Sequence, residues 1–515
     1  MTIKPFSIES FAEALSNQYT SSDVIQTKNH FKYFMTYLGE EGLHAQFIVI
    51  EEEYISKDYL HDYAAYYALC FEKYPKFCKR IHFFKTTITE DLIHKAILGH
   101  EDVPEAFWEN YLGFMVIKPI PTTVIGFSVL KHFNTSNTIP DRYYWGLRNY
   151  KVHFFGKEVE VPSLAFQEQD SVLAACATTA IWSMLNKASM DHHTILKSPS
   201  EITRDADNVS PDGSRLFPNK GLSVLQICQA IFNSGLVSEV KSDNTYVTNA
   251  KGEITDILVS NLFTKKILNA YSPLGIPIIL VISVPDGEEH GLHAITVSGY
   301  RQSPATPMDL SPETRWLAEN IDRIYAHDDQ WGPFVRIDLQ NELDLKTPWT
   351  DHHKLNLPTT VKNIIVPVYP KVRISYEDIE AIVRGIDAVL TIFFDRKIKH
   401  DLVWDIKIVY SELFKDEIKK SSLDEGEKLK RLKGSLPKYL WIATCYIGVH
   451  KVFQFTFDAT DVNNGMIGED LICYLPESER KILHSFMVKN EKVLKSVSAK
   501  RARLHYFDFL LDGLK

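Results

Sequence analysis

The sequence has few of the features that would place it in a special class of protein. Among its 515 residues there are only six cysteines, and they are widely scattered. A disulfide framework would be denser and would occupy a shorter chain. We therefore expect free thiols and a reducing compartment, which favours a cytoplasmic protein. The six are Cys70, Cys78, Cys176, Cys228, Cys445 and Cys473.

Signs of a membrane or nucleic-acid partner are also missing. The longest strongly apolar stretch runs from about Ile276 to Val284, which is too short to cross a bilayer and suits a buried strand. The first residues lack the basic segment and apolar segment of a signal peptide. The formal net charge of −9 supplies no strong phosphate-binding field. We predict neither membrane nor nucleic acid as the main partner.

Length and composition indicate a large globular protein. The hydrophobic fraction is 45% and the charged fraction is 24%, both ordinary values for a folded chain. A chain of this length is expected to form roughly three domains. We predict a mixed α/β N-terminal domain at residues 1–160, a central domain at 161–345 and a mixed α/β C-terminal domain at 346–515. Neither flanking region shows a catalytic constellation, so their roles are not predicted.

The central region places helices before strands. Helices are expected at Ala175–Leu185 and Ser223–Ser234, and Ser223 with Gln226 forms a capping box at the start of the second. Helices followed by strands, without βαβ alternation, predict an α+β domain with a largely antiparallel sheet. The strands are expected at Ile278–Val284, Ala294–Gly299, Ile324–Ala326 and Phe334–Ile337.

The first segment with candidate chemistry is FQEQDSVLAACATTAIWSML, in which Cys176 begins an apolar helix after a polar loop. The first helical turn has unpaired N–H groups and the positive end of the helix dipole. Both favour the thiolate, which is the reactive form of cysteine. An amide of Gln167 or Gln169 could complete an oxyanion hole with the Cys176 N–H. The alternative is a buried structural cysteine.

The second segment is EEHGLHAITVSGYR, in which His293 precedes an alternating apolar strand. A histidine held at the entry of a strand could act as a general base toward a thiol on a facing helix. His290 and His293 also form an H-x-x-H pair. No further ligands follow at a recognisable spacing, so we predict no metal and no cofactor. A structural histidine is the alternative interpretation.

The third segment is IYAHDDQWGPF, in which Asp328 and Asp329 follow a short strand. A carboxylate at a strand end can orient an imidazole through its Nδ1–H. Successive side chains of a strand point to opposite faces, so only one of the two is expected to reach His293. Trp331 could shield that hydrogen bond from water. The alternative is an ordinary polar turn.

Together the three segments resemble the papain-like cysteine peptidase superfamily, which has Gln, Cys at a helix start, His in a strand, then Asn or Asp at a strand end. HAITVSGY is similar to the papain-type histidine strand, and DQWG is similar to Asn-Ser-Trp-Gly with Asp329 at the Asn position. The Cys-Ala start and the GLSVLQICQAIFNSGL helix look closer to bacterial double-glycine leader peptidases. The resemblance covers about residues 165–340. It departs at Ala177, where papain has Trp, and at Gln169, one position farther from Cys176 than is usual.

The resemblance implies that Cys176 is the nucleophile, His293 the base, Asp329 the orienting carboxylate with Asp328 as fallback, and Gln169 the oxyanion donor. It implies a cysteine peptidase that hydrolyses peptide or isopeptide bonds of a protein or peptide substrate through a thioester on Cys176. The flanking domains are then expected to control access or to bind a regulatory protein. Two alternatives stay open: a related acyl-transfer enzyme, either an amidase or transglutaminase-like, and a catalytically silent interaction scaffold.

Overall fold

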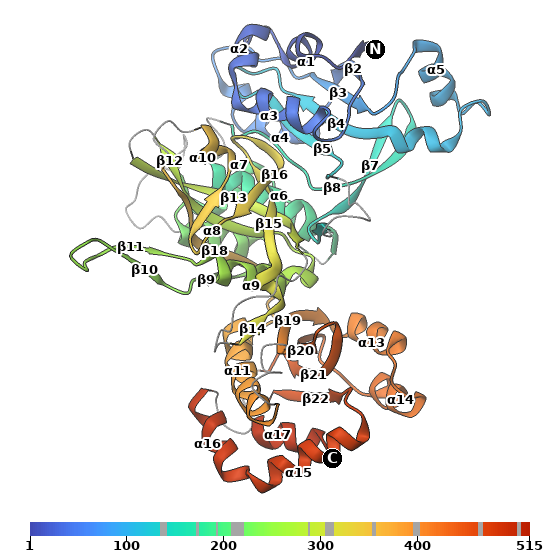
Figure 1. Ribbon diagram of the computed structural model, residues 1–515. Helices are drawn as coiled ribbons and strands as arrows, with labels where there is room; N and C mark the ends of the chain where they lie inside the picture. The colour runs from blue at the N-terminus through green and yellow to red at the C-terminus, as the bar shows by residue number, and fades with distance from the viewer. Residues whose placement is uncertain are drawn as a thin grey trace. The chain divides into compact units, whose positions relative to one another are not determined.

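The computed structural model shows a mixed α+β protein with 38% helix, 34% strand and mostly antiparallel sheets, as predicted. It forms two compact units (Figure 1). The first comprises Met1–Ser260, Ile276–Arg301 and Arg323–Pro367, and the second comprises Asn261–Gly275, Gln302–Asp322 and Val368–Lys515. The structure describes residues 1–133, 142–170, 175–191, 194–207, 221–286, 289–303, 314–352, 357–394, 402–461, 467–501 and 506–515.

These two units differ from the three predicted consecutive domains. The predicted boundary at residue 160 lies inside strand β8 (Lys157–Ser163). Strand β18 (Thr359–Val368), beyond the predicted limit at 345, pairs with β12 (Ile278–Asp286) in the central sheet. Pairing between distant segments, which sequence patterns do not show, is the physical reason for the difference.

The N-terminal part of the first unit is a five-stranded antiparallel sheet in the order β1-β2-β3-β4-β5. Its core joins it to the central part, since Phe34 and Tyr37 of α3 lie in the same hydrophobic cluster as Tyr325 and Phe334. The strands are β1 (Thr2–Pro5), β2 (Phe47–Tyr54), β3 (Cys78–Phe84), β4 (Tyr111–Ile117) and β5 (Ile125–Leu130). The helices are α1 (Ile8–Leu15), α2 (Ser22–Thr27), α3 (Asn29–Leu38), α4 (Lys57–Ala65) and α5 (Glu90–Leu98).

The central part is an eight-stranded sheet that closes on itself. Its strands follow the order β12-β13-β15-β16-β17-β18-β9, and β6 pairs with β13. Because β18 also pairs with β12, the strands from β12 to β18 in this order form a ring. The remaining bounds are β6 (Arg142–Tyr144), β9 (Val237–Lys241), β13 (Glu289–Gln302), β15 (Ile321–Asp328), β16 (Gly332–Leu339) and β17 (Asp344–Lys346).

Helices α6 (Cys176–Asp191), α7 (Pro199–Ala206) and α8 (Val224–Asn233) belong to the same unit. Helix α6 begins one residue after the predicted start and extends beyond the predicted end at Leu185. Its contacts with the sheet include a hydrogen bond from Thr296 Oγ1 of β13 to the Ala180 carbonyl at 2.8 Å. The capping box of Ser223 and Gln226 at the start of α8 is confirmed. The hydrogen bond from Thr296 ties the second turn of α6 to β13.

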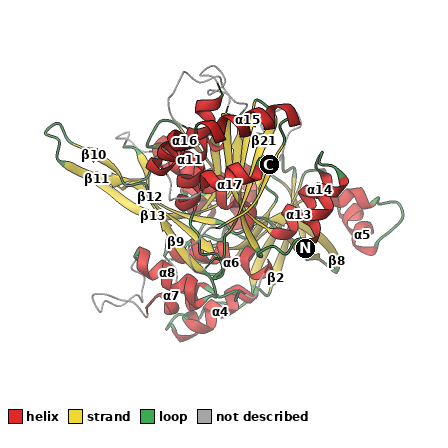
Figure 2. Cartoon of the chain, turned by 90° about the horizontal axis from the view of Figure 1, so that it is seen from below, coloured by secondary structure: helices red, strands yellow, loops and turns green. Residues whose placement is uncertain are grey.

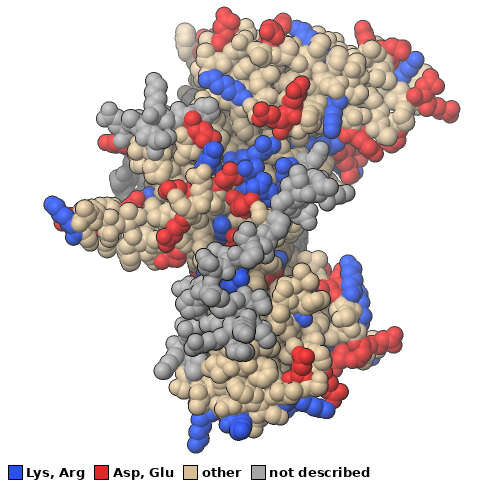
Figure 3. Space-filling model, in the orientation of Figure 1, with Lys and Arg blue, Asp and Glu red and all other residues tan. Residues whose placement is uncertain are grey.

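Two hairpins complete the first unit. Strands β7 (Arg148–Phe154) and β8 pair in antiparallel register, as do β10 (Thr245–Thr248) and β11 (Ile254–Leu258). Figures 1 and 2 both show the β10–β11 hairpin projecting from the rest of its unit. Acidic and basic side chains are interspersed on the face seen in Figure 3.

The second unit contains the sheet β14-β19-β20-β21-β22. Strand β20 (Tyr439–Ile447) pairs with β19 on one side and with β21 on the other. Among the described residues, no helix is long and apolar enough to cross a membrane. The strands are β14 (Arg315–Trp316), β19 (Leu402–Tyr410), β20, β21 (His450–Asp458) and β22 (Gly468–Cys473). The helices are α9 (Asn261–Tyr271), α11 (Tyr376–Phe393), α13 (Ser411–Lys420), α14 (Glu425–Lys433), α15 (Glu477–Lys489), α16 (Glu491–Arg501) and α17 (Tyr506–Gly513).

Candidate active site

Cys176 is the first residue of α6, as the sequence predicted, and its side chain is partly exposed. The helix is anchored about two turns further on, where Ser183 Oγ donates to the Ala165 carbonyl at 3.0 Å. A narrow space beside the thiol is lined by Phe166, Cys176, Thr179, Ala180, Ser183, Ala294, His327 and Asp329. The thiol therefore lies at the end of a buried helix, beside groups from β13 and β15.

His293 lies on β13 opposite Ile282 and is only 5% exposed. Its ring interacts with both Asp328 and the Cys176 thiol. Burial disfavours the charged ring, but the charge of Asp328 and the hydrogen bonds to Asp328 and Cys176 raise the pKa of His293 well above its ordinary value. The surroundings of His293 therefore favour the protonated ring, which is the state that the ring reaches when it takes the proton of the Cys176 thiol.

His290 and His293 do not form the metal pair that their spacing allowed. His290 is exposed and lies opposite Pro285, whereas His293 is buried. Side chains three residues apart on a strand point to opposite faces. The structure thus brings only His293 to Cys176.

Asp328, at the end of β15, is the carboxylate that hydrogen-bonds to the imidazole. Its Oδ1 accepts from His293 Nε2 at 2.9 Å and from the Gln330 N–H at 3.0 Å. Its Oδ2 accepts from Trp349 Nε1 at 2.8 Å. Burial opposes ionisation, but the charge of His293 and these hydrogen bonds lower the pKa of Asp328 below its ordinary value. Asp328 is thus an ionised, fully bonded partner for the ring.

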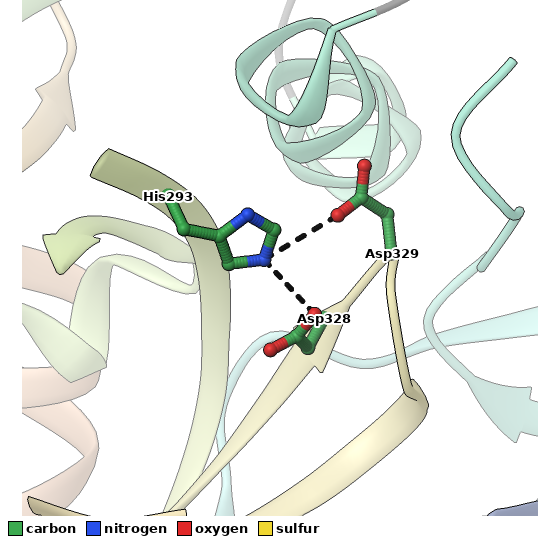
Figure 4. A group of neighbouring side chains, drawn as sticks. All are labelled: His293, Asp328 and Asp329. Carbon is green, nitrogen blue, oxygen red and sulfur yellow. Dashed lines mark hydrogen bonds and ion pairs between the residues drawn. The ribbon is translucent and has the colours of Figure 1, made fainter. Parts of the chain in front are cut away.

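The sequence match had assigned this position to Asp329 with Asp328 as fallback, and in the structure Asp328 makes the hydrogen bond to the ring. Asp329 Oδ1 lies 3.4 Å from His293 Nε2, and neither of its carboxylate oxygens has a hydrogen-bond partner among the described residues (Figure 4). Burial and the neighbouring charge of Asp328 raise the pKa of Asp329 to about 7. The β15–β16 register shifts between Ala326 and Asp328, which changes the face that Asp328 presents. Asp329 lies beyond the end of β15, in the turn, where strand alternation no longer applies.

The ring nitrogen used also differs from the expectation. We expected a carboxylate to bind Nδ1–H, but Asp328 accepts its hydrogen bond from Nε2. The 3.4 Å contact of Asp329 Oδ1 also involves Nε2. Figure 4 shows the other ring nitrogen pointing away from the two carboxylates. This arrangement leaves Nδ1 of His293 for the thiol.

Trp349 of α10 (Pro348–His352) contacts both members of the pair, whereas the sequence pointed to Trp331 as the tryptophan beside it. The Trp349 ring lies edge-on to the His293 ring, with centroids 5.3 Å apart. Trp331 packs behind it, with a centroid distance of 5.9 Å between the two tryptophans. Trp349 lies outside the segment that resembles a known family, so no sequence signal pointed to it.

Gln169 is close to the site, but through a different contact from the one expected. Its Oε1 accepts from Gln330 Nε2 at 2.8 Å, and the Gln330 N–H in turn donates to Asp328. Gln167 is buried. Residues 171–174, which connect Gln169 to Cys176, lie outside the described residues. The oxyanion role of Gln169 therefore stays a prediction.

Sequence reasoning also missed His30, which lies in the N-terminal region where no chemistry was expected. His30 Nε2 donates to the main-chain oxygen of Asp329 at 2.7 Å. Its Nδ1 lies 3.5 Å from Glu168 Oε1. Residues almost three hundred positions apart cannot be associated by local patterns, so only the fold reveals the contact.

A bound metal ion is the alternative explanation for the grouping of His293, Asp328 and Asp329. His293, Asp328 and Asp329 each offer one ligand atom, and these atoms lie within 4.8 Å of one another. The Nε2–Oδ1 distance of 2.9 Å is that of a direct hydrogen bond. An ion would need to lie about 2.0–2.2 Å from each ligand. The arrangement described therefore fits an imidazole–carboxylate pair better than a metal centre.

No protein-family model matches the chain, and no curated protein matches it. The assignment of chemistry therefore depends on the geometry of these residues.

Proposed function

We propose that the chain is a papain-like cysteine hydrolase that acts on peptide or isopeptide bonds. The observation that carries the proposal is the buried Asp328–His293 pair, whose ring also interacts with a thiol at the start of a helix. A cysteine with only a structural role would not require a buried imidazole that is hydrogen-bonded to a carboxylate. Perturbed titratable groups gathered around one nucleophile are characteristic of catalytic sites.

The proposed reaction proceeds through a thioester. The thiol of Cys176 gives its proton to His293, and the thiolate attacks the carbonyl carbon of the substrate amide. The C–N bond then breaks, and the imidazolium of His293 protonates the leaving amine. Water attacks the thioester and gives one proton to His293, which returns it to the sulfur. The products are an amine and a carboxylic acid, and the enzyme is regenerated.

Asp328 acts on this cycle through the ring. By accepting from Nε2, it holds the imidazole in one orientation and one tautomer, with Nδ1 directed to the sulfur. Its negative charge stabilises the imidazolium that forms when the thiol is deprotonated. The hydrogen bonds from Trp349 and from the Gln330 N–H keep the carboxylate itself from rotating.

The transition state also needs a place for the developing negative charge on oxygen. The N–H of Cys176 lies in the first turn of α6, where backbone donors have no partner within the helix. We expect this N–H and the Gln169 amide to form the oxyanion hole. If an amine rather than water accepts the acyl group, the same site becomes a transferase.

Turnover of a fluorogenic peptide amide tests the proposal. Wild type should release the fluorophore, and Cys176→Ala should abolish release without loss of folding. Cys176→Ser should be nearly as inactive because a serine hydroxyl is much less acidic. Cys228→Ala, at another partly exposed cysteine on α8, is the matched control and should behave as wild type. Equal activity in Cys176→Ala and wild type would refute the proposal, and product analysis with added amine separates hydrolysis from transfer.

A further inference from the structure

The turn between β15 and β16 is held from outside the central sheet by helix α3. His30 Nε2 lies 2.7 Å from the main-chain oxygen of Asp329. A carbonyl oxygen can only accept, so the Nε2–H of His30 is the donor. His30 is 7% exposed, and this hydrogen bond therefore competes little with water.

The hydrogen bond from His30 acts on one end of a single peptide unit. The Asp329 carbonyl and the Gln330 N–H belong to the same planar group, and in a trans peptide they point in opposite directions. The Gln330 N–H donates to Asp328 Oδ1 at 3.0 Å. That same oxygen accepts from His293 Nε2 at 2.9 Å. Rotation of this one plane would therefore remove a donor from the carboxylate that orients the ring.

Strand pairing does not fix this plane. The β15–β16 pairing ends at Asp328 opposite Gly332, so the Asp329–Gln330 peptide lies in the turn beyond the ladder. A second contact, at the other ring nitrogen, helps to orient the His30 ring. Its Nδ1 lies 3.5 Å from Glu168 Oε1, and Glu168 Oε2 accepts from the Ile125 N–H at 3.0 Å.

We propose that His30 is a positioning residue of the catalytic centre, which holds the Asp329–Gln330 peptide so that its N–H fixes Asp328 against His293. This inference rests on the proposed function. It makes the N-terminal region a part of the active site, although His30 does not contact the reacting atoms. The effect should appear in kcat and not in KM, because His30 has no contact with substrate.

Two amide substitutions test this role, because glutamine and asparagine carry the same amide group and differ only in the length of the side chain. In His30→Gln the side-chain nitrogen can occupy the place of Nε2 and still donate to Asp329. In His30→Asn the shorter side chain places its nitrogen near the position of Nδ1. We expect His30→Gln to keep kcat within about threefold of wild type and His30→Asn to lose about tenfold or more, with KM unchanged in both. His94→Asn, at an exposed histidine on α5, is the control.

Equal kcat values in His30→Gln and His30→Asn would overturn the inference, whether both are high or both are low. A second readout does not depend on turnover: in protein with isotope-labelled histidine, the Nε2–H resonance of His293 should persist in His30→Gln and weaken in His30→Asn. An unchanged resonance in His30→Asn would also contradict the role. If wild type and every variant fail to cleave any acyl substrate, the proposed function fails, and the resonance still decides whether His30 positions Asp328.

Discussion

At the scale of single residues, the site depends on two adjacent carboxylates with opposite character. Asp328 accepts three hydrogen bonds, and its pKa is lowered. Asp329 is equally buried, its carboxylate has no hydrogen-bond partner among the described residues, and its pKa is raised to about 7. Burial penalises the charged form of Asp329, and the neighbouring charge of Asp328 adds to this penalty, so the two carboxyl groups should differ in protonation below about pH 7.

The first prediction separates the two acids by activity. Asp328→Ala should lower the rate on one peptide substrate by about a hundredfold or more, because the imidazole loses its orienting acceptor. Asp328→Asn should retain more activity, since an amide oxygen can still accept from Nε2–H. Asp329→Ala should cost much less than Asp328→Ala. A larger loss in Asp329→Ala would restore the assignment that the DQWG motif suggested.

The second prediction concerns the pH dependence of stability. The pKa of Asp329 is about 7 in the folded protein and about 3.9 in an unfolded chain, so the folded state binds its proton more tightly. Such a group stabilises the fold at low pH, and this stability is lost as the pH rises through about 7. Asp329→Asn stays neutral and should therefore gain free energy of unfolding relative to wild type between about pH 4 and pH 8.

Denaturant unfolding at both pH values measures the difference between the two proteins. Asp91→Asn, at an exposed aspartate on α5, is the control and should show no such trend. If the difference between Asp329→Asn and wild type stays constant over this pH range, the raised pKa of Asp329 is wrong.

At the scale of elements, the turn between β15 and β16 packs closely against α3. A Cβ atom added to Gly332 would lie 2.2 Å from Cδ1 of Tyr33, much less than a van der Waals contact. Tyr33 also donates a hydrogen bond to the Pro333 carbonyl. The helix and the turn therefore fit only when position 332 has no side chain.

The third prediction follows from that contact. Gly332→Ala should destabilise the protein by about 1–3 kcal/mol, the usual cost of overpacking, and should reduce turnover by displacing Asp328. Thermal unfolding and peptide turnover measure the two effects. Gly221→Ala, where an added Cβ meets no atom within 4 Å, is the matched control. Wild-type behaviour of Gly332→Ala would show that the turn does not depend on this fit.

Local patterns predicted much of the secondary structure and part of the site. The capping residues of α8, the strands β12 and β13 and the position of Cys176 at a helix start follow from short-range chemistry. The contacts of His30 and Trp349 could not be predicted, because they depend on how distant segments pack. The exchange of Asp328 for Asp329 has a local cause, a register shift, that alternation rules do not include.

At the scale of the whole molecule, the predicted central domain is not self-contained. Strand β18 closes its sheet from beyond residue 345, and the core around Tyr325 and Phe334 includes Phe34 and Tyr37 of α3.

The fourth prediction is that a fragment of residues 161–345 will not fold, whereas residues 1–367 will retain more native structure. Circular dichroism and thermal unfolding distinguish the two. Cooperative unfolding of the shorter fragment would show that the N-terminal region is dispensable.

The most direct test of the central claim is to find which cysteine reacts first. Burial raises the pKa of Cys78 to about 12 and raises the pKa values of Cys228, Cys445 and Cys473, so these thiols should react slowly near neutral pH. Limiting iodoacetamide on native protein, followed by peptide mapping, should place the adduct on Cys176. The rate should fall strongly in His293→Ala and remain unchanged in His290→Ala. Modification of Cys70 or Cys228 before Cys176, or an equal rate in the two histidine variants, would contradict a Cys176–His293 catalytic pair.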